Sequence, residues 1–508
     1  MTPRPPPRRL DPLRRESLHT AAATRHLEAI AQARLPAHEL MKRAGAAVAR
    51  LARAWAPHAQ RIWIATGPGN NGGDGWVAAT HLLQAGVPDV WVTQTGEPDR
   101  LPDDAAWARQ SALAAGVTVR ANAPASADLI IDALLGLGAS RTPIGALGEQ
   151  IKTIRHSTSP VLCIDLPSAL DADTGACLGP VPGATGPRMT ISLLTLKPGL
   201  FTARGRDLAG EVWFDDLGVD REGAASACAH WGGADSDRSD RAMCAHASHK
   251  GSFGDVAVIG GQGPHIDGAG MVGAAILAAR AALHGGAGRV FVGLLDNGGT
   301  HWDPRAPELM MRRPDRLIEP DFLAHATVVA GCGGGLAVKA LLDPLLRQAK
   351  RLVLDADALN TLAQSASLTN LLRERREHRL ETVITPHPLE AARLAGSSTA
   401  DVMGDRLGCA RALAQDLGVV CVLKGAGTVV ASPDALPWIN ATGNARLATA
   451  GTGDVLAGML GASVACSPER PLRERVERAV ARHGALADAW PVQQALSASR
   501  LADAGLPW

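Results

Sequence analysis

Short apolar runs alternate with helical patterns along most of this chain, and no other feature constrains its fold as strongly. In the first half, the runs RIWIAT, DVWVTQ, ADLIIDA and PVLCID are short and rich in β-formers. Stretches such as WVAATHLLQAG, with apolar residues three and four positions apart, separate them. Short buried strands that alternate with helices are typical of a parallel sheet covered on both faces. The sequence therefore predicts an α/β protein.

The alternation is interrupted once, which predicts two domains. It fades after EVWFDDLGVD, and residues 221–248 mix Ala, Gly, Ser and Asp without periodicity before it resumes at GDVAVIGG. A chain of 508 residues is also too long for one ordinary domain. Because no repeat relates the halves, we expect two different α/β domains. The predicted organisation is a disordered basic leader at 1–17, a first domain at 18–220, a linker at 221–245 and a second domain at 246–508.

Composition and charge argue against nucleic-acid-binding and membrane proteins. The 51 basic and 50 acidic residues give a formal net charge of +1. No apolar run approaches the roughly 18 residues that span a bilayer, and the Pro- and Arg-rich start lacks the apolar region of a signal peptide. The 8 cysteines are scattered without a C-x-x-C pair, which favours a reducing compartment over a disulfide framework or zinc site. We expect a cytoplasmic protein with no nucleic-acid or membrane partner.

The stretch GPGNNGGDG follows the first predicted strand and fits G-x-G-x-x-G through Gly67, Gly69 and Gly72. A dinucleotide fingerprint also needs an acidic residue at the end of the second strand, where this chain has Thr or Gln. Tight packing alone does not explain the two asparagines and the aspartate in this stretch. Oxygen donors of this kind suit a hard cation such as K⁺, Na⁺, Mg²⁺ or Ca²⁺, or a hydroxylated ligand.

Further polar side chains follow two other predicted strands of the first half. Asp132 lies in DALLGLG, and Asp165 and Ser168 lie in DLPS. Taken singly, each aspartate is equally well explained as a helix cap or turn residue. Because the carboxyl ends of parallel strands meet at one edge of a sheet, we expect these residues to share one site with the glycine-rich stretch.

Two glycine-containing turns in the second half indicate phosphate chemistry. GTGD opens a predicted helix, whose free N–H groups favour an anion, and Asp454 beside it can take a proton from a hydroxyl that attacks phosphorus. Taken alone, this motif is often an ordinary helix start. LKGAGT adds a glycine turn with Lys424, which suits nucleotide phosphates. The absence of G-x-x-x-x-G-K-[ST] argues against a P-loop.

Three other motifs of the second half admit both a functional and a structural interpretation. TPHP fixes His387 between prolines, which modestly favours ligand contact over core filling. LDADALN has two carboxylates at a strand end, one of which suits a helix cap. GCGGG permits close approach to a ligand or forms a simple turn.

Together these motifs resemble the bifunctional NAD(P)H-hydrate repair enzymes. LMKRAG, GPGNNGGDG, DALLGLG, IDLPSALDADTG and LKPGL match the epimerase half in order. HKGSFGDVAVIGG, GAAILAARAALHGGAG, APELM, LDADALN, TPHPLE, LKGAGT and NARLATAGTGDVLAGML match the dehydratase half. The resemblance implies two α/β domains, a Rossmann-like three-layer sandwich followed by a ribokinase-like α/β domain.

The resemblance also implies an activity, the repair of hydrated NADH and NADPH. The first domain interconverts the R and S hydrates, and the second dehydrates the S form with ADP, giving AMP and phosphate. The implied cofactors are K⁺ at the epimerase site and Mg²⁺ at the dehydratase site, with ADP as phosphoryl donor. The implied partners are these small molecules, and we expect a homo-oligomer.

Residues of the first half acquire roles through the same resemblance. It implies that Asp165 does proton or orientation work and that K⁺ is held by Asn71, Asp132 and Ser168. It implies that the substrate is contacted by Asn70, Asn71, Gly72, Gly73, Asp74, Gly136, Leu137, Gly138, Ala139, Ser140, Arg141, Thr142 and Asp165.

Residues of the second half acquire roles in the same way. Asp454 is implied to be the catalytic base. Substrate contacts are implied for Ala274, Gly335, His387 and Asp454. Nucleotide contacts are implied for Lys424, Gly425, Ala426, Gly427, Thr428 and Gly453.

The chain departs from the family pattern at three places. Ala169 stands where a glycine is expected after Ser168, and Cys332 stands where a proline is usual. Residues 262–272 form a longer segment than expected, which leaves Ala269 as a rival to Ala274, although helix spacing favours Ala274. The alternative function is that of a ribokinase-like small-molecule kinase with a non-catalytic N-terminal nucleotide-binding module.

Overall fold

The computed structural model describes residues 5–179, 183–220, 226–234 and 247–504. The chain forms two compact units, which are described separately. Unit 1 comprises Met1–Asp11 and Glu16–His230, and unit 2 comprises Pro12–Arg15 and Trp231–Trp508. The division at 230/231 falls inside the predicted linker, of which residues 221–225 and 235–245 lie outside the described part. Two short strands, β2 (Glu16–Leu18) and β10 (Ala229–Gly232), lie where the chain passes from one unit to the other.

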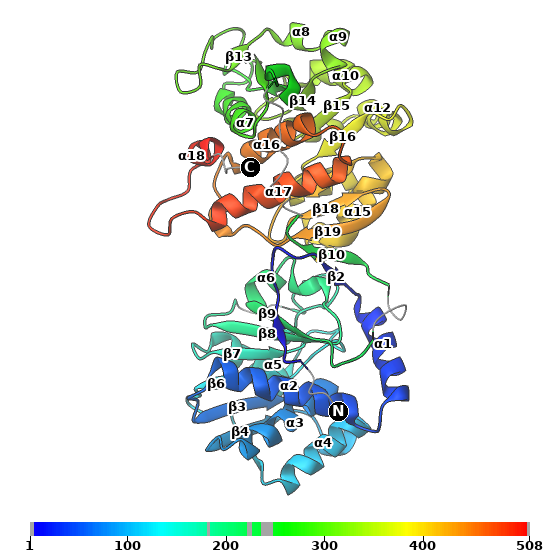
Figure 1. Cartoon of the computed structure of the whole chain (residues 1–508), viewed down its shortest axis with the longest axis vertical. Helices are drawn as coiled ribbons and strands as arrows, with labels where there is room; N and C mark the ends of the chain where they lie inside the picture. Colours follow the sequence, from blue (N-terminus) through cyan, green and yellow to red (C-terminus); the bar gives the residue numbers. More distant parts are fainter. Residues whose placement is uncertain (1–4, 180–182, 221–225, 235–246, 505–508) are drawn as a thin grey trace. The chain divides into compact units, whose positions relative to one another are not determined.

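Unit 1 contains a sheet of strand order β1-β9-β8-β7-β6-β3-β4-β5 (Figure 1). Every neighbouring pair is parallel except β1 and β9. The order β5-β4-β3-β6-β7-β8 is that of a doubly wound Rossmann sheet, with its topological switch point between β3 and β6. The strands are β1 (Arg8–Arg9), β3 (Arg61–Thr66), β4 (Asp89–Gln94), β5 (Thr118–Val119), β6 (Leu129–Ala133), β7 (Val161–Ile164), β8 (Arg188–Leu193) and β9 (Glu211–Asp215).

Helices cover both faces of this sheet. Successive residues of a strand point to opposite faces, and in these strands both sets of side chains are apolar. Ile62 and Ile64 of β3 belong to one apolar core with helices α2 and α3, whereas Trp63 and Ala65 belong to another with α5. The prediction of a Rossmann-like three-layer sandwich is therefore confirmed. The helices are α1 (Ala21–Arg34), α2 (Glu39–Trp55), α3 (Asn70–Gln84), α4 (Asp103–Ala114), α5 (Gly145–His156) and α6 (Gly205–Leu208).

Unit 2 is also an α/β structure, as predicted. Its strands follow the order β13-β12-β11-β14-β15-β16-β17-β18-β19, in which the pairs from β13 to β17 are parallel and the last two are antiparallel. The strands are β11 (Asp255–Gly260), β12 (Arg289–Leu294), β13 (Met310–Met311), β14 (Thr327–Ala330), β15 (Arg351–Leu354), β16 (Glu381–Ile384), β17 (Val420–Leu423), β18 (Val429–Ser432) and β19 (Ala435–Asn440).

Alanine- and glycine-rich helices allow close helix packing in unit 2. Helices α7 and α16 join strand residues such as Val256 and Val329 in one buried cluster, since small side chains let helices approach the sheet closely. The helices are α7 (Val272–His284), α8 (Pro314–Leu317), α9 (Pro320–Leu323), α10 (Lys339–Gln348), α11 (Asp357–Ala363), α12 (Ala366–Glu377), α13 (Pro388–Ala395), α14 (Thr399–Gly404), α15 (Arg406–Leu417), α16 (Thr452–Cys466), α17 (Leu472–Asp488) and α18 (Ala498–Asp503).

The prediction of a disordered leader at 1–17 is wrong for the part that the structure describes. Arg8 and Arg9 form β1, which pairs antiparallel with Phe214 and Trp213 of β9, and Leu10 is buried. The reason is that the edge of β9 offers unpaired backbone groups that a passing segment can satisfy. Local composition does not reveal such a partner.

The glycine-rich stretch is helical over most of its length, which the sequence did not predict. Helix α3 begins at Asn70, so only Gly67–Gly69 form a loop. Glycine lowers helix propensity, but here tertiary packing prevails. A Cβ at Gly73 would come 2.4 Å from Cε of Met41 in α2, so glycine lets the two helices touch. Upstream of this stretch, residues 19–55 form the two helices α1 and α2.

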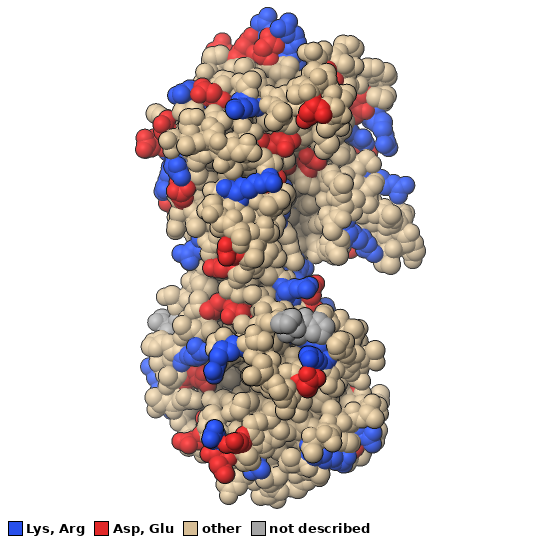
Figure 2. All heavy atoms as spheres, turned by 180° about the vertical axis from the view of Figure 1, so that it is seen from behind, with Lys and Arg blue, Asp and Glu red and all other residues tan. Residues whose placement is uncertain are grey.

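Charges of both signs are interspersed on the face that Figure 2 shows, in keeping with the near-neutral composition. Among the described residues, no helix is both long and apolar enough to cross a bilayer.

Candidate active sites

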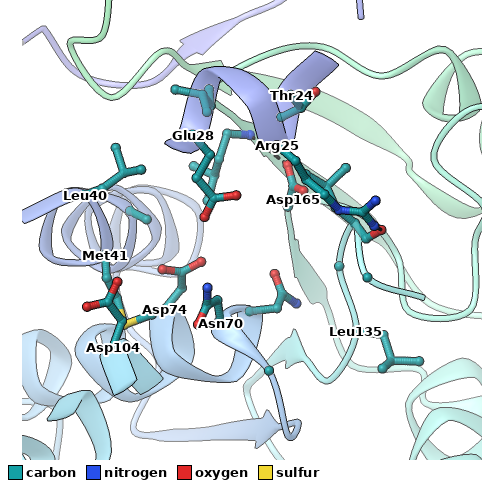
Figure 3. A pocket seen from close by; sticks show the side chains of 18 of the residues that line it. Thr24, Arg25, Glu28, Leu40, Met41, Asn70, Asp74, Asp104, Leu135 and Asp165 are labelled. Atoms are coloured by element: carbon teal, nitrogen blue, oxygen red, sulfur yellow. Dashed lines mark hydrogen bonds between the residues drawn. The ribbon is translucent and has the colours of Figure 1, made fainter. Parts of the chain in front are cut away.

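A pocket of about 490 Å³ lies in unit 1 at the switch point of the sheet. Ligands of open α/β sheets gather at this point, beyond the carboxyl ends of the strands. Figure 3 shows α1, α2 and α3 contributing side chains to it, with Asp165 entering from the end of β7. The lining residues that the sequence predicted are Asn70, Asn71, Asp74, Gly136, Leu137, Gly138, Ala139 and Asp165.

Other predicted substrate residues do not line this pocket in the described part of the chain. Gly72 and Gly73 are buried, and Gly73 packs against Met41. Ser140, Arg141 and Thr142 are also absent from the lining, and Thr142 packs against Gly179. In this structure Gly73 therefore serves helix packing, and Gly72 allows close contact with the Gly67 carbonyl.

The predicted cation ligands Asp132 and Ser168 form one buried network below the pocket. Ser168 Oγ donates to Asp132 Oδ1 over 2.6 Å, and the Ser168 amide donates to Asp132 Oδ2 over 3.0 Å. The Leu135 amide donates to Ser168 Oγ over 2.9 Å. Asn71 lies close by, because a Cβ at Gly136 would be 3.0 Å from its Oδ1. The structure thus brings together residues that lie in or just after three different strands.

Asp165 is fixed by a lysine that the sequence analysis left without a role. Lys197 has no exposed surface, and its ammonium donates to Asp165 Oδ1 and to the Leu193 carbonyl. The Leu193 amide also donates to Asp165 Oδ1, over 3.1 Å. Asp165 adopts a left-handed backbone conformation, with φ of 64°, which is strained for most side chains. The LKPGL motif was the available signal for Lys197.

Three more carboxyl groups face the same pocket, and only one was predicted. Glu28 of α1 and Asp104 of α4 join Asp74 of α3 (Figure 3). Burial and the carboxylates of Glu28 and Asp165 raise the pKa of Asp74 well above its usual range. Burial and Asp165 also raise the pKa of Glu28. No local pattern marks Glu28, because only the tertiary fold brings α1 to the pocket.

The candidate site of unit 2 is a cluster at the carboxyl ends of β14, β15 and β17. Ligand atoms of Cys332, Asp355 and Asp454 lie within 4.8 Å of one another. Lys424 Nζ donates to Asp355 Oδ1 over 2.7 Å, and Thr385 Oγ1 donates to the same oxygen over 2.6 Å. The sequence predicts roles for Asp454 and Lys424 but none for Cys332, whose thiol was not expected to join a group of possible metal ligands.

Asp454 lies in the first turn of α16, as the GTGD motif predicts. Burial and the neighbouring Asp355 raise the pKa of Asp454 to about 6. Burial works against the charge on Lys424, but Asp355 and Glu390 outweigh it and raise the pKa of Lys424. A Cβ at Gly453 would be 3.5 Å from Lys424 Nζ, so the two motifs LKGAGT and GTGD meet in space.

His387 has a structural role, and its predicted contact with the substrate stays a prediction. Its Nδ1 accepts the amides of Leu389 and Glu390 as the N-cap of α13, while about half of its side chain, 47%, is exposed. Burial and the nearby Lys424 lower the pKa of His387. It therefore presents a neutral, rigid ring at the edge of the cluster.

The remaining predicted residues of unit 2 lie around the same strand ends. The Gly335 amide donates to Asp357 Oδ2 over 2.8 Å, and Ala274 of α7 lies against Gly333. Thr428 Oγ1 donates to the Gly425 carbonyl over 3.1 Å. Ala426 is exposed and Gly427 is buried in the same turn.

Strained backbone marks both sites. Ala356, between Asp355 and Asp357, has φ of 49°, and Ala169 has φ of 66°. Non-glycine residues in this region cost free energy and persist only where the surroundings fix them. The glycine expected at 169 therefore matches what the backbone requires.

Comparisons with known proteins identify the family. Residues 37–199 match the family described as YjeF-related protein N-terminus, and residues 256–505 match NAD(P)H-hydrate dehydratase. The bifunctional NAD(P)H-hydrate repair enzyme Nnr of Escherichia coli (strain K12) is 39% identical over 445 residues, covering 84% of this chain and 81% of that protein. The chain belongs to the bifunctional NAD(P)H-hydrate repair enzymes.

Other relatives of this repair enzyme agree. The bifunctional NAD(P)H-hydrate repair enzyme of Leishmania braziliensis is 34% identical, covering 88% of this chain and 84% of that protein. The ADP/ATP-dependent NAD(P)H-hydrate dehydratase of Bacillus subtilis, crystallised with ATP/Mg²⁺, is 29% identical and covers 51% of this chain and 90% of that chain, with a TM-score of 0.40. The family resemblance is confirmed for both domains, and the kinase alternative is not supported.

Proposed function

We propose that this chain repairs hydrated NADH and NADPH. Unit 1 interconverts the R and S hydrates, and unit 2 dehydrates the S form with ADP, giving AMP and phosphate. Asp454 carries this proposal, because a carboxyl with a pKa of about 6 beside Lys424 suits a base that acts near neutral pH.

The cluster in unit 2 suits phosphoryl transfer to a hydroxyl. Hydroxide is a poor leaving group, whereas a phosphate ester leaves readily, so phosphorylation makes the elimination easier. Asp454 takes the proton of the attacking hydroxyl, and Lys424 lies where it stabilises phosphate charge. The carboxylate of Asp355 would help to hold Mg²⁺, which would neutralise charge on the nucleotide, while Asp454 stays free to act as the base.

The pocket in unit 1 is the proposed epimerase site. Its volume of about 490 Å³ suits part of a dinucleotide, such as the nicotinamide riboside end. Asp165 enters this pocket with its orientation set by Lys197 and by the Leu193 amide. A carboxylate fixed in this way is suited to accept a proton at the hydroxyl-bearing centre of the substrate.

We also propose that K⁺ binds between Asn71, Asp132 and Ser168. Two observations support this fit. Among the described residues, no lysine or arginine lies within ion-pair distance of the buried Asp132, and the Asn71 Oδ1 atom faces Gly136, whose neighbour Leu135 donates its amide to Ser168 Oγ. A buried carboxylate without a cation is costly, and the available donors are oxygen-rich, as K⁺ prefers.

The test is a coupled assay of the purified protein on each hydrate epimer, with and without ADP. We expect ADP-dependent recovery of reduced nicotinamide absorbance from the S form, and from the R form through prior epimerisation. Replacing K⁺ by Cs⁺ should slow only the epimerisation. Accumulation of a stable phosphorylated substrate would overturn the dehydratase assignment in favour of a kinase.

We further propose a homo-oligomer that acts in the cytoplasm. The free cysteines of the described residues support a reducing compartment. Sedimentation equilibrium of the purified protein measures its oligomeric state.

A further inference from the structure

The carboxyl groups of Glu28 and Asp74 point toward each other across the pocket of unit 1. Figure 3 shows Glu28 reaching down from α1 and Asp74 reaching up from α3, with Asp165 on the other side of the pocket from Asp74. Asp104 of α4 lies beside Asp74. These carboxyl groups come from four separate segments, so the fold assembles them although their like charges repel.

The basic side chains near this pocket bind groups other than Asp74. Lys197 binds Asp165, and Arg25 donates to the Leu137 carbonyl. His38 binds Asp104, with 2.6 Å between Nδ1 and Oδ1, and stacks on Trp107. Within the described ranges, the Asp74 side chain has no ion pair or hydrogen bond.

We infer that Asp74 is the general acid of the epimerisation, and that Glu28 is a positioning residue which keeps the proton on it. This inference rests on the proposed epimerase function of unit 1. It goes further by assigning opposite proton-transfer roles to Asp74 and Asp165.

The environments of the two aspartates support these different roles. Asp165 accepts hydrogen bonds from Lys197 and from the Leu193 amide, so it is arranged as an acceptor. Asp74 faces carboxylates instead, and burial together with Glu28 raises its pKa well above the usual range. Enzymes commonly assign the acid and the base through such contrasting surroundings.

The chemistry balances without a co-reactant. Water added to the enamine of the dihydronicotinamide ring leaves its hydroxyl on a carbon bonded to the ring nitrogen. Asp74 gives its proton to this hydroxyl, the C–O bond breaks with its electron pair on oxygen, and water leaves as the nitrogen lone pair forms a C=N bond.

Water then adds to the opposite face of the ring. Its oxygen lone pair forms the new C–O bond, the C=N electron pair returns to nitrogen, and the carboxylate of Asp165 takes the released proton. Exchange with solvent returns the proton from Asp165 to Asp74. The protein and the bulk water are then unchanged. The ring differs only in the configuration of the carbon that carries the hydroxyl.

The first experiment measures epimer exchange by Asp74→Asn in the full chain, corrected for the spontaneous rate. We expect a loss of at least about 100-fold in kcat, because an amide cannot donate an acidic proton. Dehydration of the S epimer with ADP, measured on the same sample, should be retained. Removing one carboxyl from an anionic cluster should leave the melting temperature unchanged or raise it.

The second experiment is the pH profile of epimerisation by Glu28→Gln. Without the Glu28 charge, Asp74 loses its proton at lower pH, so the alkaline limb of kcat/KM should move to lower pH by at least about half a unit. A purely structural role of Glu28 would change the rate without moving this limb. Asp103→Asn is the matched control, since Asp103 is exposed on α4 and does not line the pocket.

The outcomes separate this inference from the proposed function. If the unmodified protein does not accelerate epimer exchange, the epimerase proposal itself fails. If it does, and Asp74→Asn stays within about threefold of it, the assignment of Asp74 is overturned. An unmoved alkaline limb in Glu28→Gln overturns the role of Glu28.

Discussion

Asp454 shows how the surroundings of one residue set its chemistry. Burial and Asp355 raise its pKa to about 6, so its carboxylate is retained at neutral pH but binds a proton more readily than a solvent-exposed aspartate. Such a group accepts a proton more readily than an ordinary aspartate and is still ionised at neutral pH.

The first prediction concerns the pH dependence of dehydration. Asp454 must be ionised to accept a proton, so kcat/KM should fall about tenfold per pH unit below a midpoint near 6. Asp454→Asn should abolish this dependence and lower the rate by at least about 1,000-fold. A profile that stays flat down to pH 5 would contradict the role of Asp454 as base.

The ionisation of Asp454 also lowers the stability of the folded state. Its pKa is raised on folding, so its ionisation destabilises the folded state as pH rises from about 4 to about 6. Asp454→Asn should therefore raise the free energy of unfolding of unit 2 at pH 7, by on the order of 1–2 kcal/mol after screening. Urea titration of both proteins measures the difference.

The second prediction concerns Ala169, which is buried with φ of 66°. Ala169→Gly should relieve about 1–2 kcal/mol of strain. The lost burial of a methyl group, about 0.8 kcal/mol, and the greater freedom of unfolded glycine offset this gain. We expect a net change below about 1 kcal/mol, whereas Ala169→Val should destabilise by more than about 2 kcal/mol. Thermal unfolding of the two variants distinguishes these effects.

At the scale of elements, one buried arginine joins α12 to the end of α10. Arg375 is 1% exposed and donates to Thr382 Oγ1 and to the carbonyls of Leu345, Leu346, Ala349 and Glu381. The carbonyls of Leu346 and Ala349 lie at the C-terminal end of α10, where helix carbonyls lack intrahelical donors. Burial lowers the pKa of Arg375 to about 10, and the group remains charged.

The third prediction follows from this contact. Arg375→Met should leave buried carbonyls without donors and lower the free energy of unfolding by about 3–5 kcal/mol. Arg376→Met is the matched control, because Arg376 is exposed and its one ion pair within the described residues is with the exposed Asp434, a contact worth less than about 1 kcal/mol. Equal losses in the two variants, measured by denaturant titration, would contradict the element-joining role.

At the scale of the whole molecule, each unit contains its own site. The pocket residues of unit 1 and the cluster of Asp355, Lys424 and Asp454 share no residue. The two proposed activities should therefore be separable by single substitutions.

The fourth prediction is complementation. Asp165→Ala should lose epimerisation but dehydrate the S hydrate, and Asp454→Asn should do the reverse. An equimolar mixture should repair both epimers at a rate near half that of the unmodified protein, since the free intermediate diffuses between molecules. Failure of the mixture to repair the R form, followed by reduced nicotinamide absorbance, would show that the activities depend on each other.

The sequence by itself determined the α/β class, the two domains and the residues at the strand ends. Alternating apolar runs require parallel sheets, and loops after parallel strands meet at one edge. Asp132, Asp165 and Asp454 could therefore be chosen from their positions in the sequence alone. The motif order then identified the family.

Only the tertiary structure decided which groups share a site and in what state of protonation. Glu28, Lys197 and Asp355 take part through contacts with residues distant in sequence, and no local pattern encodes such contacts. Burial and neighbouring charge, which raise the pKa of Asp74, arise only when the chain folds. The same holds for the leader, which is ordered because β9 offers it an edge to pair with.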